Sequence, residues 1–341
     1  MLSAIALAAV AGTACLLREK SLRRTHPMAG GLHPDIALAH SGRFELWHNA
    51  LSLCSKKVRM CLAELGVAYV SHHIDLIETG SYQTLSREFL AVNPAALVPV
   101  LVHDGHPVYE SHEIIRYAAE HSPGGSAMLP IEPRDVAMMD HWIHKSSLLG
   151  DHPVSELTVS AGNCVPGLTI PLFSAMIADI PAWRIVEGLL FHRLKGRPAF
   201  FMLLKLTGLA RLDGLLPVVK LIGASRAQME RHLDELEAHL ANGALIREPT
   251  PRWIVGHRFT LADVSWAVIM DRLREADWTD VLESPRRPNV SDWWRRIRER
   301  PAYRASMLGE FEHPLVRKGT ERIIALKAHN ERFRGAIYTS R

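Results

Sequence analysis

The segment LSLCSKKVR places Ser52 and Cys54 two positions apart, just before a helical pattern. Both residues are expected in the turn between a strand and a helix, where the first backbone N–H groups of the helix have no partner within it. The start of a helix binds anions, and a hydroxyl or thiol beside it can contact the bound anion. The ordinary alternatives stay open, because serine is a common N-cap and cysteine a common small core residue.

Two further segments carry polar or rigid residues at the ends of elements. In NPAALVPVL, Val98 and Pro99 precede an apolar strand, and in YESHEI, Glu110 and Ser111 begin a helix. An ordinary helix cap is the alternative interpretation of the second pair.

Two histidines that share one face of a predicted helix are candidate metal ligands. His141 and His144 lie three residues apart, with Asp140 one turn from His144. No third convincing ligand is close in the sequence, so the prediction is that this chain has no metal site.

The elements around these residues alternate between strand and helix. Phe44–His48 has the alternation of a strand, and SKKVRMCLAELG repeats apolar residues at helical spacing until Gly66, a helix C-cap. The same reasoning predicts a strand at 67–75, a helix at 81–92, strands at 98–102 and 107–109, and a helix at 111–120. The order β-α-β-α-β-β-α predicts a small mixed sheet with helices.

The remainder of the chain is expected to be helical. Proline and glycine mark a linker at 123–134, before an all-helical domain at 135–315. Thr260 and Asp263 form a capping-box pattern at the start of one of its helices. The proline-rich, apolar stretch 151–224 is interpreted as an insertion, either core or lid over a binding cleft, or a surface for a membrane or a partner. A charged tail is predicted at 316–341.

Composition excludes several classes of protein. The 341 residues carry 40 Lys and Arg against 36 Asp and Glu, a net charge of +4 without a basic tract, which argues against nucleic-acid binding. The four cysteines include no C-x-x-C pair and are too few for a disulfide scaffold. A reducing compartment, the cytoplasm, is therefore expected.

The first 42 residues are interpreted as an apolar segment followed by a linker. Leu2–Leu17 is uncharged, and basic residues follow it, an order that differs from a secretory signal. Three interpretations stay open: a weak membrane anchor, translation starting at Met28, and export.

Taken together, the motifs resemble the cytosolic glutathione transferases over about residues 44–310. The matching features are the Val98-Pro99 pair before a strand, the Glu110-Ser111 pair at a helix start and the Thr260–Asp263 capping box. The resemblance implies a thioredoxin-like, glutathione-binding domain at 43–122, an all-α C-terminal domain, glutathione as co-substrate and a homodimer.

Within that family, S-x-C-S followed by V-R is similar to the zeta class, which contains maleylacetoacetate isomerases, and to tetrachlorohydroquinone reductive dehalogenases. Ser52 matches the catalytic serine, and Cys54 matches the neighbouring cysteine. Leu53 and Leu97 depart from the isomerase-like pattern, and the stretch 151–224 and the segment RHLDELEAHL resemble the dehalogenase more.

The resemblance implies a role for each matched residue. A thiol with a pKa of about 8.5 is only a few per cent ionised at neutral pH, and lowering that pKa by about two units takes roughly 2.7 kcal/mol. A hydrogen bond from the Ser52 hydroxyl and the helix N-terminus supply energies of this size. Pro99 is expected to be cis, so that the Val98 backbone pairs with glutathione, while Glu110 and Ser111 bind its γ-glutamyl end.

The second substrate is expected to be a small, apolar, aromatic or quinone-like electrophile. In a reductive reaction, Cys54 would attack the sulfur of the glutathione–aryl thioether and form a mixed disulfide. The alternative function is a non-catalytic, glutathione-transferase-like binding protein at a membrane, with the N-terminal segment giving weak membrane association.

Overall fold

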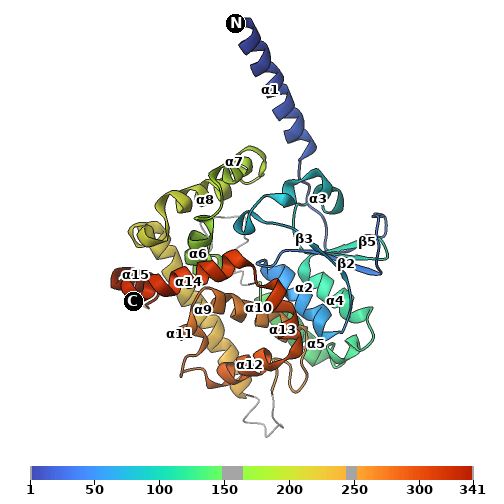
Figure 1. Cartoon of the computed structure of the whole chain (residues 1–341). Helices are drawn as coiled ribbons and strands as arrows, with labels where there is room; N and C mark the ends of the chain where they lie inside the picture. The colour runs from blue at the N-terminus through green and yellow to red at the C-terminus, as the bar shows by residue number, and fades with distance from the viewer. Residues whose placement is uncertain (1, 148–163, 243–251, 340–341) are drawn as a thin grey trace.

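The computed structural model describes residues 2–147, 164–242 and 252–339, which form an N-terminal domain with a sheet and a helical C-terminal domain (Figure 1). The N-terminal domain comprises β1 (Gly31–Leu32), β2 (Phe44–His48), α2 (Leu53–Glu64), β3 (Val70–His73), η1 (Ile77–Thr79), η2 (Gln83–Leu85), α3 (Arg87–Val92), β4 (Val100–His103), β5 (His106–Tyr109) and α4 (Ser111–Glu120). From β2 onward this order confirms the predicted thioredoxin-like succession of strands and helices.

Strand register brings three connections to one end of the sheet. The strand order is β1-β5-β4-β2-β3, with β2 and β3 parallel and the other pairs antiparallel. Trp47 near the end of β2 pairs with Val100 at the start of β4, and Leu101 pairs with Val108 near the end of β5. The loop after β2, the loop before β4 and the loop after β5 therefore meet at this end.

The segment before β2 is part of the sheet, whereas the sequence analysis interprets it as a linker. Gly31 and Leu32 pair with Tyr109 and Val108. Met28 and other apolar residues of this segment pack against the cluster on one face of the sheet. The reason is that β5 would otherwise leave a row of backbone groups without strand partners.

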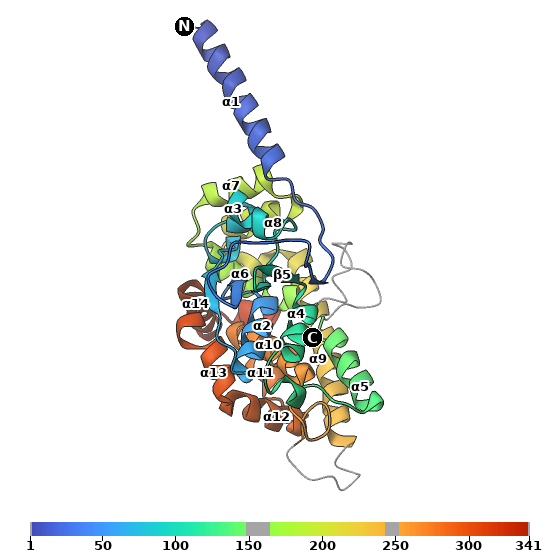
Figure 2. The same cartoon turned by 90° about the vertical axis from the view of Figure 1, so that its right-hand side faces the viewer.

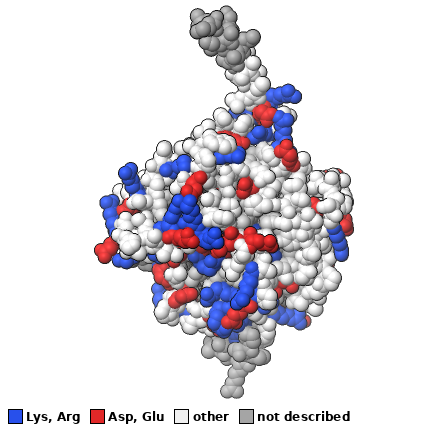
Figure 3. Space-filling model, in the orientation of Figure 1, with Lys and Arg blue, Asp and Glu red and all other residues white. Residues whose placement is uncertain are grey.

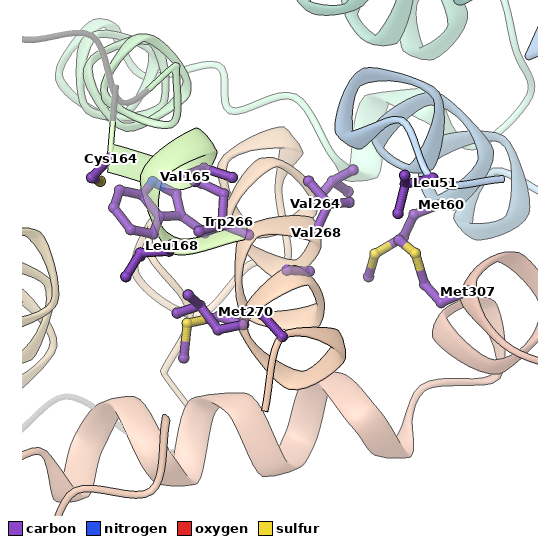
Figure 4. Packing of buried hydrophobic residues seen from close by; sticks show 14 of the residues in the cluster. Leu51, Met60, Cys164, Val165, Leu168, Val264, Trp266, Val268, Met270 and Met307 are labelled. Atoms are coloured by element: carbon purple, nitrogen blue, oxygen red, sulfur yellow. The ribbon is translucent and has the colours of Figure 1, made fainter. Parts of the chain in front are cut away.

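The C-terminal domain is built around α10 (Leu261–Glu275). Trp266 faces α6, while Val264 lies toward α2, so that α10 joins the two domains (Figure 4). The predicted capping box is confirmed, with the Thr260 N–H donating to Asp263 Oδ2 at 2.9 Å. The other helices are α5 (Pro133–Lys145), α6 (Cys164–Ile177), α7 (Ala182–Phe191), α8 (Gly196–Thr207), α9 (Leu216–Asn242), α11 (Thr279–Leu282), α12 (Pro288–Glu299), α13 (Pro301–Met307), α14 (Pro314–His329) and α15 (Glu331–Ile337).

The sequence predicts an insertion at 151–224, and the described part of this stretch forms both core and a contact with the N-terminal domain. Residues 148–163 lie outside the described residues. Helix α6 is buried and packs on α9 and α14, so it is core rather than an addition to it. Helices α7 and α8 lie against the N-terminal domain, where a Cβ on Gly188 would come within 2.3 Å of the Tyr82 ring.

The predicted charged tail is helical. Helices α14 and α15 bury an apolar set spaced along them, and Gly319 lies against Leu172 and Met176 of α6. The buried side chains of this set are Val316, Ile323, Phe333 and Ile337.

Helix α1 (Leu2–Leu22) projects from the body in both views (Figures 1 and 2). Within the described ranges, none of the helices combines the length and the apolar character needed to cross a bilayer.

Candidate active site

Ser52 is the N-cap of α2. Its Oγ accepts a hydrogen bond from the Ser55 backbone N–H at 3.3 Å, and its side chain is half-buried. Because Oγ acts as acceptor in this contact, the hydroxyl hydrogen is available to donate to a ligand. The sequence-predicted position of Ser52, in a strand-to-helix turn, is where the structure places it.

Asn49, which the sequence analysis missed, fixes the turn that carries Ser52. Its Oδ1 accepts from the backbone N–H groups of Leu51 and Ser52 at 2.9 and 3.1 Å. Its Nδ2 donates to Ile74 O and Thr79 Oγ1, both at 2.9 Å. A fully buried side chain with all these contacts holds the turn in one conformation.

Two buried arginines also hold the turn that carries Ser52. Arg59 of α2 donates to the carbonyl oxygens of Asn49 at 2.8 Å and of Ala50 at 3.1 Å. Arg272 of α10 donates to the carbonyl of Leu51. The sequence shows three basic residues, Lys56, Lys57 and Arg59, within a largely apolar helix, and this pattern does not indicate which groups they contact.

His48, at the end of β2, contacts Arg59 and so helps to hold the turn that carries Ser52. Its Nδ1 lies 3.2 Å from Arg59 Nη1, and its Nε2 lies 2.7 Å from Ser71 Oγ. Burial, together with the neighbouring Arg59 charge, lowers the pKa of His48 to about 3. The neutral ring accepts from the guanidinium, which the protonated ring cannot do.

This shift predicts loss of stability in acid. The pKa of His48 is lower in the folded chain than in the unfolded one, so the stabilisation is complete above pH 6.5 and is lost as the pH falls toward 3. Between pH 7 and 4.5 the wild type should lose about 2–3 kcal/mol more than His48→Gln, in which the amide oxygen still accepts from Arg59. Urea unfolding at both pH values measures this difference. His329→Gln, at an exposed position, is the control, and an equal loss in wild type and His48→Gln would contradict the assignment.

Cys54 lies exposed in the first turn of α2, two residues after Ser52. Lys57, one turn further, is buried, and burial lowers its pKa to about 8, while the neighbouring Cys54 opposes that change. His112 in the first turn of α4 lies near Lys57, since burial and then the Lys57 charge lower its pKa to about 3. Lys57 and His112 therefore add a cation and a neutral ring to the region next to Cys54.

The other predicted residues follow from the strand register. The Val98-Pro99 peptide bond is cis, which confirms the expectation, and it directly precedes β4. Glu110 is exposed, with φ 64° and ψ 120°, and Ser111 is buried at the first position of α4. A non-glycine residue in this region of φ and ψ is uncommon and is found often at ligand sites.

These residues come together at one end of the sheet, because the three connections that carry them meet there. The starts of α2 and α4 both face this end, with the Val98-Pro99 loop between them. Helix starts present unpartnered N–H groups and partial positive charge, so the arrangement suits an elongated, acidic, peptide-like ligand.

Trp142 is buried, packs edge-on against Trp266, and accepts at its backbone carbonyl from the Trp266 indole N–H at 3.0 Å. It is a core residue because the all-helical domain buries α5 on this face.

An open groove of about 600 Å³ is lined by Glu64, Met128 and Phe259 among others. It lies at the other end of α2 from Ser52, about 18 Å away by helix rise.

A set of possible metal ligands lies elsewhere in the described part of the chain. His73, Asp75 and His313 offer ligand atoms within 4.8 Å of one another. His141 and His144 of α5, considered from the sequence, do not belong to this set.

Comparison with known proteins agrees with this architecture. The family model of the glutathione S-transferase N-terminal domain matches residues 51–121, and that of the C-terminal domain matches residues 210–296. The tetrachloro-p-hydroquinone reductive dehalogenase of Sphingobium chlorophenolicum is 23% identical over 264 residues, 76% of this chain and 93% of that protein. Glutathione S-transferase TCHQD of Arabidopsis thaliana is 27% identical over 265 residues, 76% of this chain and 88% of that protein.

Among solved structures, β-etherase LigF from Sphingobium sp. strain SYK-6 superimposes with a TM-score of 0.60 at 19% identity, covering 78% of this chain and 98% of that one. This likeness concerns the fold, and it extends over both domains. With both family models in the expected order on a sheet domain followed by a helical domain, the chain belongs to the glutathione S-transferase family.

Proposed function

We propose that this protein activates glutathione as a thiolate and transfers it to a small, apolar, aromatic or quinone-like electrophile. The observation that carries the proposal is the position of Ser52 at the N-cap of α2, where Oγ accepts from Ser55 N–H and keeps its own hydrogen for the ligand. Glutathione is the co-substrate that the family uses.

The energies are sufficient for this role. A hydrogen bond to a charged sulfur contributes about 1.5–3 kcal/mol, and the N-terminus of α2 adds about 0.3–1 kcal/mol. Their sum lowers a thiol pKa by about one to three units, since one unit corresponds to 1.36 kcal/mol. No strong base is needed beside the thiol.

Glutathione would lie across the end of the sheet with its cysteinyl sulfur at Ser52. The Val98 backbone would pair with the cysteinyl backbone as an added strand. The Glu110 carboxylate would bind the γ-glutamyl ammonium, and Ser111 with the α4 N-terminus would bind the γ-glutamyl carboxylate.

For the reaction itself we propose reductive dehalogenation of a chlorinated hydroquinone, supported by the dehalogenase relative and by the exposed Cys54 next to Ser52. Glutathione thiolate displaces chloride and forms an aryl thioether. The Cys54 thiolate attacks the thioether sulfur, the aryl carbon leaves with the electron pair and takes a proton, and a Cys54–glutathione disulfide remains. A second glutathione releases oxidised glutathione and restores Cys54. Overall, ArCl and two glutathiones give ArH, oxidised glutathione and HCl.

Ser52→Ala tests the core of the proposal. Loss of the hydrogen bond to sulfur should lower kcat/KM for conjugation about 10- to 100-fold and raise the pKa in its pH profile by one to two units. The profile is measured with a model chloroaromatic electrophile, and thiolate formation is followed by its ultraviolet absorbance.

Ser86→Ala is the matched control, because Ser86 caps α3 in the same way, with Oγ accepting from Phe89 N–H at 3.1 Å. Both variants lose about 1 kcal/mol of stability, but only Ser52→Ala should change the pH profile. Calorimetry of glutathione binding, combined with the turnover assay, distinguishes the proposed enzyme from a non-catalytic binding protein. Tight binding without turnover of any electrophile would instead favour the non-catalytic binding protein, and absence of binding would contradict both.

A further inference from the structure

Helix α1 exposes apolar side chains within residues 10–22, the part whose side chains the structure describes. Val10, Leu16, Leu17 and Leu22 are 67, 41, 61 and 47% exposed. An uncharged helical stretch of this kind gains free energy when its side chains leave water. The ribbon of α1 meets the body only at its last turns (Figures 1 and 2).

A second apolar surface lies on α7, at the same end of the molecule. Trp183, Val186 and Leu190 are 59, 42 and 41% exposed and follow one another at i, i+3 and i+7, so they share one face of the helix. The opposite face, with Ile185 and Gly188, is buried against the N-terminal domain. We call the three exposed side chains the α7 face.

Side-chain contacts hold α1 in a fixed place beside α7. Arg23 pairs with Glu187 of α7 at 3.2 Å, and its guanidinium lies 4.6 Å from the centre of the Phe191 ring. Glu19 pairs with Arg87 of α3. The end of α1 is therefore tied to both domains, and the two apolar surfaces keep their relative orientation.

Basic side chains gather between the two surfaces. Arg18, Lys20 and Arg24 follow the apolar part of α1 and are exposed, as are Arg193 and Lys195 after α7. Lys20 lies near Lys195, since burial and then the Lys20 charge lower the pKa of Lys195. Figure 3 shows Lys and Arg side chains, with some acidic ones, where α1 leaves the body, and an uncharged surface on α1 beyond them.

We propose that α1 and the α7 face dock this protein on the surface of an anionic bilayer, with the basic side chains between them in contact with lipid headgroups. Apolar side chains enter the boundary of the acyl chains, tryptophan takes its usual place at the interface, and each basic residue near the surface adds attraction to anionic lipids. A second copy of the chain fits less well, because pairing these surfaces would bring like charges together.

Co-sedimentation of the full chain with vesicles tests the proposal. Binding to phosphatidylcholine vesicles containing one quarter phosphatidylserine should be at least tenfold tighter than to phosphatidylcholine alone, and should weaken as salt increases. The variant Trp183→Ser/Val186→Ser/Leu190→Ser should bind at least tenfold more weakly, as should Leu16→Ser/Leu17→Ser. The matched control is Ile131→Ser/Ile324→Ser, at positions 82 and 50% exposed elsewhere on the surface.

Unchanged turnover of the glutathione reaction shows that each variant is folded, so failure of docking and failure of the proposed activity are separate results. Equal vesicle binding by wild type and both apolar variants would overturn the proposal, as would absence of binding to both kinds of vesicle. Light scattering could instead show that the α7 variant loses self-association while its vesicle binding is unchanged. That result would assign the α7 face to contact with a second copy of the chain and would also overturn the proposal.

Discussion

Cys54→Ser is expected to abolish the release of dechlorinated product, by at least 100-fold, while conjugation of glutathione continues. A serine hydroxyl at this exposed position cannot attack the thioether sulfur or form the mixed disulfide, so the aryl–glutathione thioether should accumulate. Mass spectrometry of the products from a chlorinated hydroquinone distinguishes thioether from dechlorinated hydroquinone. On the wild-type enzyme, the same method should detect the glutathione adduct of Cys54.

Cys15→Ser is the control for this experiment. Cys15 is the second exposed cysteine of the described residues, and it lies on α1, far along the chain from the active site. Its replacement should leave both products unchanged. Undiminished dechlorination by Cys54→Ser would exclude the mixed disulfide, although glutathione conjugation through Ser52 would stand.

Lys56→Met is expected to destabilise the fold by about 3 kcal/mol, because it leaves buried carboxylates without one of their cations. Lys56 Nζ lies 2.6 Å from both Asp271 and Glu275 of α10, and all three side chains are at most 5% exposed. Nearby charges, Lys56 first among those that lower it, hold the pKa of Asp271 well below its usual range against the effect of burial. Arg274 and Arg272 remain as partners of the two carboxylates, which places the loss at the lower end of the range for buried pairs.

Urea unfolding at pH 7 measures this loss. The control is Lys318→Met, since Lys318 pairs with Asp179 at 3.0 Å but is 53% exposed, and its removal should cost less than about 1 kcal/mol. The variant Lys56→Met/Glu275→Gln should recover part of the lost stability, because the uncompensated charge is removed as well. Equal effects of the two lysine substitutions would mean that the buried cluster contributes no more than a surface pair.

The order of elements could be predicted from the sequence where the signals are local. Alternation in Phe44–His48, the glycine that ends α2 and the Thr260–Asp263 capping box all depend on neighbouring residues, and the structure contains each of them. By contrast, β1 has two residues and exists because β5 offers it a partner. The sequence of α14 and α15 instead predicts a charged tail, since the buried residues of these helices are widely spaced among charged ones.

The candidate site likewise contains some residues that could be predicted from the sequence and others that could not. Ser52, Val98 and Glu110 could be predicted because each occurs in a short motif at the end of an element, and their roles stay predictions. Asn49 and Arg59 could not, because what makes them important is a set of contacts with backbone groups brought near by folding. Arg59 also donates to Ser306 O, 247 residues away in the chain, a partner that no local pattern indicates.

The two-residue strand β1 has a consequence for how this protein behaves at high concentration. Strands at the edge of a sheet are templates for pairing with other chains and so for aggregation, and β1 occupies that position beside β5. The backbone bond from His26 N–H to Pro94 O at 2.8 Å fastens the segment that leads into it. A shortened chain that starts at Phe44 would contain every element of the thioredoxin-like succession but would leave β5 open at the edge of the sheet. A chain that starts before His26 would keep β5 covered by the short strand β1.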